Sequence, residues 1–271
     1  MKVTGHLQKM QTKLESPVAY FMPLDEHLEA MNPHIGSTIS LHATGNIHCV
    51  ACGRKTNKSY SQGQCFPCMK SLPECDMCIM KPETCHYEQG TCRDAAWGDA
   101  HCMQPHTVYL ANSSGLKVGI TRQLPTRWID QGASEALAIM EVSHRHLSGL
   151  VEVILKDHVS DRTDWRKMLK GSPENVDLEA RRDELLATCA DELAGLKKQF
   201  GDDAMIELDN SPRASIDYPV NDYPDKVKSL NFDKTPRISG VLQGIKGQYL
   251  ILDCGVLNIR KFSGYEIEFE A

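Results

Sequence analysis

The stretch TVYLANSSGLKVGITR, residues 107–122, has the pattern of two short strands joined by a polar turn. Apolar residues alternate with other types on both sides, and Asn112–Gly115 supplies residues that favour a turn. The two strands bring Tyr109 and Lys117 near Gly119, where the missing side chain allows another group to approach the backbone closely. We therefore expect a β-hairpin over these residues.

Helical segments are predicted after the hairpin. Asp177–Phe200 has the clearest helical pattern, because its apolar residues form one stripe and Gly201 follows its end. Shorter helices are expected at Pro125–Gln131, which Gly132 would stop, and at Gly149–His158, which Asp161–Lys170 continues. Together with the hairpin, the shorter helices define an α/β module over residues 107–175.

Both ends of the chain are expected to form strands. Near the N-terminus the β-like runs are Val18–Met22 and Thr38–Leu41, with interruptions at Pro23 and Pro33 and a turn at Gly45–Asn46. Residues 237–270 contain four short β runs, and residues 210–236 resemble an extended linker. We predict an α+β protein in which the termini form a small barrel or sheet. Its expected parts are an N-terminal β region (1–48), a cysteine-rich module (49–106), the α/β module (107–175), and a long helix, linker and C-terminal β region (176–271).

The overall composition is that of a globular protein, with 271 residues, 41% hydrophobic and 24% charged. The sequence has no apolar run of membrane length and no secretion signal at its start, which predicts a cytoplasmic protein without a membrane partner. The net charge of −6 is unevenly distributed: residues 107–170 carry +2 and residues 171–271 carry −7. The central module is therefore the part that repels an anionic partner least.

Nine of the eleven cysteines fall between Cys49 and Cys102, which in a chain without an export signal favours metal binding over disulfides. Two Cys-x-x-Cys pairs, CVACG and CFPCM, are separated by twelve residues. Each pair presents two thiolates on one side, and two pairs complete the tetrahedral shell of Zn²⁺. The spacing predicts a zinc ribbon with Cys49, Cys52, Cys65 and Cys68 as ligands.

A second group of cysteines is less regular, with five thiols for a site that takes four ligands. A second structural zinc is our interpretation, and one zinc with several unliganded cysteines is the alternative. Which four bind, or whether a histidine replaces one, stays open. The group consists of Cys75, Cys78, Cys85, Cys92 and Cys102. Cys189 and Cys254 are expected to be buried hydrophobic residues.

The central module resembles the GIY-YIG nuclease superfamily. The resemblance covers residues 106–170 and rests on Tyr109, the K-V-G sequence at 117–119, Arg127 and Glu152, in that order. It is closest to the variant in which the second motif reads K-I-G, so Lys117 replaces the second tyrosine of the family. The whole chain also resembles an uncharacterised bacterial family that contains a zinc ribbon.

The resemblance implies a role for each of these side chains. Tyr109 would activate water, Arg127 would hold the scissile phosphate, and Glu152 would bind a divalent metal, which is expected to be Mg²⁺. Lys117 can bind phosphate as a point charge or, when desolvated, can act as a base. Taken singly, each residue also has an ordinary structural explanation, such as ion pairs on helix surfaces.

Three functional hypotheses follow. The first is a zinc-binding endonuclease of the GIY-YIG type that acts on nucleic acid, either RNA or a structured single strand. The second is a non-catalytic nucleic-acid-binding protein with a degenerate nuclease fold, because zinc ribbons and small β-barrels commonly recognise nucleic acid. The third is a scaffold whose acidic region, residues 171–271, binds a basic protein.

Overall fold

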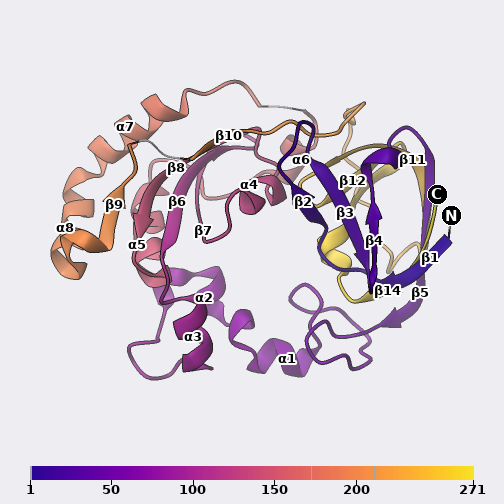
Figure 1. Ribbon diagram of the computed structural model, residues 1–271, viewed down its shortest axis with the longest axis horizontal. Helices are drawn as coiled ribbons and strands as arrows, with labels where there is room; N and C mark the ends of the chain where they lie inside the picture. The colour runs from indigo at the N-terminus through magenta and orange to yellow at the C-terminus, as the bar shows by residue number, and fades with distance from the viewer. Residues whose placement is uncertain (1, 172, 210–211) are drawn as a thin grey trace.

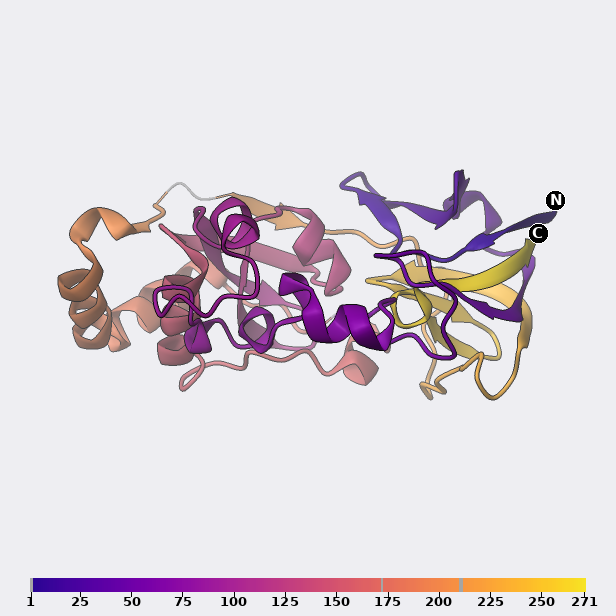
Figure 2. The ribbon, with the colours of Figure 1, turned by 90° about the horizontal axis from the view of Figure 1, so that it is seen from below.

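The computed structural model describes residues 2–171, 173–209 and 212–271. Its two lobes lie side by side (Figure 1): strands from both ends of the chain build one, and the sheet that contains the predicted hairpin builds the other. The cysteine-rich segment runs along one side, from the first lobe to the second (Figures 1 and 2). The three sheets are antiparallel, which confirms the predicted α+β class.

The first lobe contains a six-stranded sheet that joins the two termini. The C-terminal strands lie beside strands from the first 47 residues, as the sequence predicts. In spatial order the strands are β1 (Lys2–His6), β14 (Tyr265–Glu270), β5 (Thr38–Ile47), β11 (Arg237–Lys246), β12 (Tyr249–Leu252) and β13 (Gly255–Asn258). Along β14 every second residue is buried, so Tyr265, Ile267 and Phe269 face the core. A smaller sheet comprises β2 (Gln11–Lys13), β3 (Ala19–Leu24) and β4 (His27–Ala30).

Two predicted interruptions of these strands are wrong. Pro23 lies inside β3, and this is tolerated because β2 pairs only with residues 19–21, so no partner on that side needs its missing N–H. Gly45–Asn46 lies inside β5 and forms a bulge opposite Glu266, where the register of the pair β5–β14 shifts. The left-handed φ of 90° at Gly45 provides that bulge, and Thr44 and Asn46 donate hydrogen bonds to the Glu266 carboxylate.

The second lobe is built on a five-stranded sheet. The expected hairpin is present as β6 (His106–Asn112) and β7 (Leu116–Thr121), and Tyr109 pairs with Gly119. β8 (Glu135–Val142) pairs with β6 on the other side. Two short strands from the C-terminal part of the chain, β9 (Met205–Glu207) and β10 (Arg213–Ser215), also pair with β8. The predicted linker and the hairpin thus belong to one sheet.

Five helices follow the hairpin in the described ranges. They are α4 (Thr126–Asp130), α5 (Arg145–Leu155), α6 (Trp165–Met168), α7 (Leu178–Thr188) and α8 (Ala190–Phe200). One of them, α6, packs on the first lobe, where Trp165 stacks on Tyr249 and Met168 joins the cluster of Ile251 and Val256. The helix predicted over 177–200 is divided at Cys189, whose ψ of 11° leaves the helical range. Its apolar stripe is nevertheless buried, at Leu178, Leu185 and Leu193. These residues pack with α5 against one face of the sheet, while Trp128 of α4 belongs to the core shared with the first lobe.

The cysteine-rich segment consists of short helices that dock onto the second lobe. They are α1 (Phe66–Ser71), η2 (Pro73–Cys75), α2 (Met77–Met80), η3 (Pro82–Thr84) and α3 (Ala95–His101). The turn η3 packs so closely on Gly149 of α5 that a Cβ there would lie 2.6 Å from the backbone nitrogen of Glu83. Further 3₁₀ turns are η1 (Asn32–His34), η4 (Asp202–Ala204) and η5 (Ile259–Phe262).

The two isolated cysteines differ from each other. Cys189 is buried between α7 and α8, as predicted, whereas Cys254 is exposed, so that prediction is wrong. Cys254 lies in the turn between β12 and β13, and its thiol donates to the carbonyl oxygen of Ser239. No helix of the described residues is both long and apolar enough to cross a membrane.

Candidate functional site

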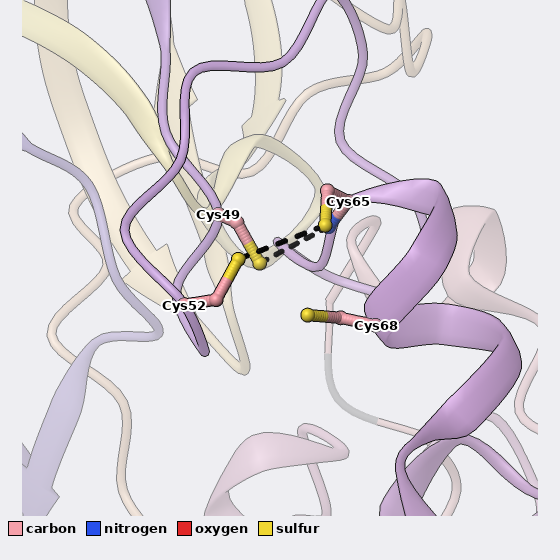
Figure 3. A group of neighbouring side chains, drawn as sticks. All are labelled: Cys49, Cys52, Cys65 and Cys68. Atoms are coloured by element: carbon pink, nitrogen blue, oxygen red, sulfur yellow. Dashed lines mark hydrogen bonds between the residues drawn. The ribbon is translucent and has the colours of Figure 1, made fainter.

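Four cysteines meet where the cysteine-rich segment leaves the first lobe (Figure 3). Cys49 and Cys52 follow the end of β5 in a tight turn, in which the Gly53 N–H donates to the Cys49 carbonyl at 2.8 Å. Gly53 has a φ of 70°, so the turn requires the freedom of a glycine. Cys65 precedes α1 and Cys68 lies within it. The second pair therefore lies at the start of a helix.

The four sulfur atoms have the spacing of a zinc site. All lie within 4.8 Å of one another, and the Cys52 and Cys65 sulfurs are 3.8 Å apart. A tetrahedron with Zn–S bonds of about 2.3 Å has an edge of about 3.8 Å. Cys49 and Cys65 are buried, Cys68 is half-buried and Cys52 is exposed. The donor set and its geometry are consistent with one Zn²⁺ held by the four predicted residues.

The surroundings of these sulfurs favour a thiolate. Burial raises the pKa of Cys49, but backbone N–H groups of Cys65, Cys52 and Ala51 oppose this and bring it to about 6. The Cys65 N–H donates to the Cys49 sulfur at 3.2 Å. The neighbouring thiols of Cys52 and Cys65 raise the pKa of Cys68. A divalent cation would stabilise the four sulfurs as thiolates, because it relieves the repulsion among them.

The other five cysteines of the segment separate into two sets. Cys75, at the end of η2, lies toward the first centre. Burial raises the pKa of Cys75, the Ser61 hydroxyl lowers it, and the charge of Cys49 raises it further. The remaining four line one small cavity with Asp76, His86 and Trp97; they are Cys78, Cys85, Cys92 and Cys102. Their mutual proximity appears in the raised pKa of Cys78, about 11, which burial causes first and the other three thiols increase.

Tyr109, the first of the four candidate residues in the chain, is completely buried. Its ring lies over Gly119 of β7, where a Cβ would come within 2.5 Å of the hydroxyl oxygen. The hydroxyl donates to the Gln131 side-chain oxygen at 2.8 Å. Burial raises the pKa of Tyr109 to about 12, although the neighbouring Arg127 guanidinium works in the opposite direction. The absence of a side chain at Gly119 therefore leaves the space that the Tyr109 ring occupies.

Lys117 lies on β7 and is only 4% exposed. Burial lowers its pKa to about 8, Arg127 adds to the effect, and Glu152 and Asp161 oppose it. Burial also raises the pKa of Glu152 on α5, which the Lys117 ammonium partly offsets. The charges of Arg127 on α4 and Glu152 on α5 each shift the pKa values of both Tyr109 and Lys117. Four elements, β6, β7, α4 and α5, therefore bring the four predicted side chains into one neighbourhood.

Sequence reasoning missed two residues around this neighbourhood and left the role of a third, Arg145, open. Gln131 receives the Tyr109 hydroxyl, and Asp161 follows a bridge between Ser160 and Lys117 that lays the segment after α5 beside β7. Arg145, at the start of α5, connects the neighbourhood to the cysteine cavity. Its charge lowers the pKa of Glu152, and its guanidinium donates to the carbonyl of Ile79, a residue of the cavity wall, at 2.7 Å. The only sequence signal for Arg145 is the polar run 144–146 before the helix.

The fold and the four-cysteine centre define an α+β protein with the ligand set of a structural zinc site. The chain belongs to the family described as "Protein of unknown function (DUF2797)", which matches residues 36–267 and so includes both the metal centre and the hairpin. The comparison with curated proteins found no match, and neither did the comparison with solved structures.

Proposed function

We propose that this protein binds nucleic acid and cleaves a phosphodiester at the site formed by Tyr109, Lys117, Arg127 and Glu152. The resemblance of residues 106–170 to GIY-YIG nucleases supports the proposal. The observation that carries it is Lys117, a residue that is only 4% exposed. Within the described chain its Nζ makes no hydrogen bond or close ion pair, and it has a second cation, Arg127, as a neighbour. Such an arrangement is unfavourable for folding, and an anionic ligand would compensate for it.

Each side chain has a role that its surroundings support. Arg127 would bind the non-bridging oxygens of the phosphate, and Glu152, with Asp161 near, would hold Mg²⁺. Lys117, with a pKa of about 8, is a better proton acceptor near neutral pH than Tyr109, with a pKa of about 12. Water would attack phosphorus and give its proton to the fraction of Lys117 that is neutral, and the P–O bond to the departing oxygen would break with its electron pair leaving on that oxygen. Glu152 would hold the metal, which would supply positive charge beside the departing oxygen.

The zinc centre is assigned a structural role in this proposal. Four thiolates leave no open position for water or substrate, so a centre of this kind does not activate a nucleophile. It would fix the end of β5 to the start of α1 and thereby hold the cysteine-rich segment across the two lobes. A second metal in that segment would stabilise the short helices that pack on α5, the helix that carries Glu152.

One observation favours the alternative, a non-catalytic nucleic-acid-binding protein. Tyr109 is fully buried and its hydroxyl is already bonded to Gln131, as expected of a structural tyrosine. In that case Lys117 and Arg127 would bind phosphate without hydrolysis.

The test is cleavage of labelled single-stranded RNA and DNA by the full-length protein with Mg²⁺. We expect Glu152→Gln to abolish cleavage, because the metal ligand is lost, and Glu141→Gln, an exposed glutamate on β8, to leave it unchanged. Salt-sensitive binding without cleavage would select the non-catalytic alternative. Cleavage that survives Glu152→Gln would reject the assigned metal site, and a nuclease-resistant interaction with a basic protein would favour the scaffold hypothesis.

A further inference from the structure

Four cysteines of the cysteine-rich segment surround one cavity. None of them is among the four zinc ligands, and none of those ligands lines the cavity. The cavity is lined by Cys78 of α2, Cys85 after η3, Cys92, and Cys102 after α3. Cys75 is not among its lining residues. Four separate turns of chain thus converge their thiols on one space, an arrangement that the spacing of six, six and nine intervening residues did not reveal.

The spacing of these sulfurs differs from that of the zinc centre. In the zinc centre all four sulfurs lie within 4.8 Å of one another. Around the cavity, by contrast, no three sulfurs of the described cysteines satisfy that condition. Thiolates that share one ion must approach to about 3.8 Å, whereas thiolates that each bind a different iron of a cluster stand farther apart.

The space between the sulfurs is also larger than one zinc ion requires. The cavity offers about 20 Å³ to the centre of a water molecule. A water-sized sphere must stay roughly 3.2 Å from a sulfur nucleus, so a closed shell with Zn–S bonds of about 2.3 Å contains no such space. The cavity is therefore wider than a closed shell around a single zinc ion.

The cavity is matched to an anionic occupant. The Arg145 backbone N–H donates to the Cys102 carbonyl at 2.8 Å, and its side chain is near Cys102 and Cys78. The Nε atom of Arg145 is buried and has no hydrogen-bond partner among the described residues. A cluster with four thiolates carries net negative charge, so this guanidinium would stabilise it as an outer partner.

We propose that Cys78, Cys85, Cys92 and Cys102 bind a [4Fe–4S] cluster. Binding is a ligand exchange in which each thiol loses its proton and its sulfur bonds to one iron of a preassembled cluster. The ligands of the donor leave with their electron pairs, and no oxidant or reductant is consumed. The cluster would brace α2, η3 and α3 against α5. This proposal does not depend on the proposed nuclease activity.

A mononuclear site beside the cavity is the competing explanation. Ligand atoms of Asp76, Cys78 and His86 lie within 4.8 Å of one another. However, the Asp76 carboxylate is already paired with Arg93, at 2.8 Å from its Nε atom. The same carboxylate oxygen lies 3.5 Å from His86. This set is better explained by the ion pair of Asp76 with Arg93, which supports the cavity wall.

The test is metal and sulfide analysis of the full-length protein, purified without oxygen from cells grown with added iron. We expect about four iron, about four sulfide and about one zinc per chain, with the visible absorption of a cluster. Cys85→Ser should lower iron and sulfide several-fold and leave zinc unchanged. Cys75→Ser, the matched control, should change none of them.

Two results would overturn the proposal. The first is about two zinc and no sulfide per chain in the unaltered protein, which does not depend on how any variant folds. The second is a loss of metal in His86→Ala together with full metal content in Cys85→Ser, which would assign the site to the mononuclear set.

Discussion

Replacing Lys117 with methionine should stabilise the protein while removing its anion-binding cation. Methionine is unbranched like lysine, only one atom shorter, and needs no hydration, whereas the ammonium of the buried residue Lys117 has no close partner among the described residues. The folded-state pKa of Lys117 is about 8, against a value of 10.5 in its ordinary state. At about 1.36 kcal/mol per pH unit, the charge reduces the free energy of unfolding by about 3 kcal/mol at pH 7.

The stabilisation expected from Lys117→Met should decrease as pH rises. The pKa of this cation is lowered by folding, so the unfavourable contribution is complete below pH 8 and declines as pH rises toward 10.5. Lys117→Met should therefore exceed the unaltered protein in stability by about 3 kcal/mol at pH 7 and by roughly half of that at pH 9.5. Urea unfolding at both values, with saturating zinc, measures the difference.

Lys156→Met provides the control, because Lys156, which directly follows α5, is exposed and its replacement should change stability by less than about 0.5 kcal/mol. Reduced stability of Lys117→Met at pH 7, or an equal gain at both pH values, would refute the assignment of a desolvated ammonium to this position.

Two further substitutions test the zinc centre and the hairpin. Cys49→Ser should remove about one zinc per chain and lower the free energy of unfolding by about 3 kcal/mol or more, since metal binding contributes directly to folding. Cys254→Ser, at an exposed thiol, should keep the zinc. Equal zinc contents in the two variants would count against the centre. Gly119→Ala should destabilise by about 1–3 kcal/mol in urea unfolding, because its Cβ would meet the Tyr109 hydroxyl at 2.5 Å. Gly195→Ala, with nothing within 4 Å, should stabilise α8 by up to about 1 kcal/mol, and the same gain at Gly119 would contradict the packing described.

Local patterns made part of this structure predictable. The hairpin of residues 106–121 was predictable because Asn112–Gly115 provides turn residues between two alternating runs. The zinc ligands were predictable because each Cys-x-x-Cys pair determines its own geometry. The strand order could be anticipated only in outline, since the termini had the patterns of strands that need partners.

The features that depend on long-range contacts could not be predicted from the sequence. β5 continues through Gly45 because β14, more than 200 residues away, pairs with it, and no local signal indicates this. The five irregular cysteines could not be sorted, because loop paths move Cys75 toward the first centre and the other four around a separate cavity. The role of Gly119 was also hidden, since it depends on the ring of Tyr109 across the hairpin.

The central claim, that Lys117 and Arg127 form a site for the phosphates of nucleic acid, is tested most directly by the salt dependence of binding. The affinity of the full-length protein for a labelled single-stranded oligonucleotide would be measured by fluorescence anisotropy over a range of salt concentrations. For Arg127→Met we predict weaker binding and a slope of log K against log salt that is less steep by about 0.7, because one phosphate contact is lost. Arg162→Met, at a side chain that is 91% exposed, should retain the original slope. An unchanged affinity and slope for Arg127→Met would contradict the claim.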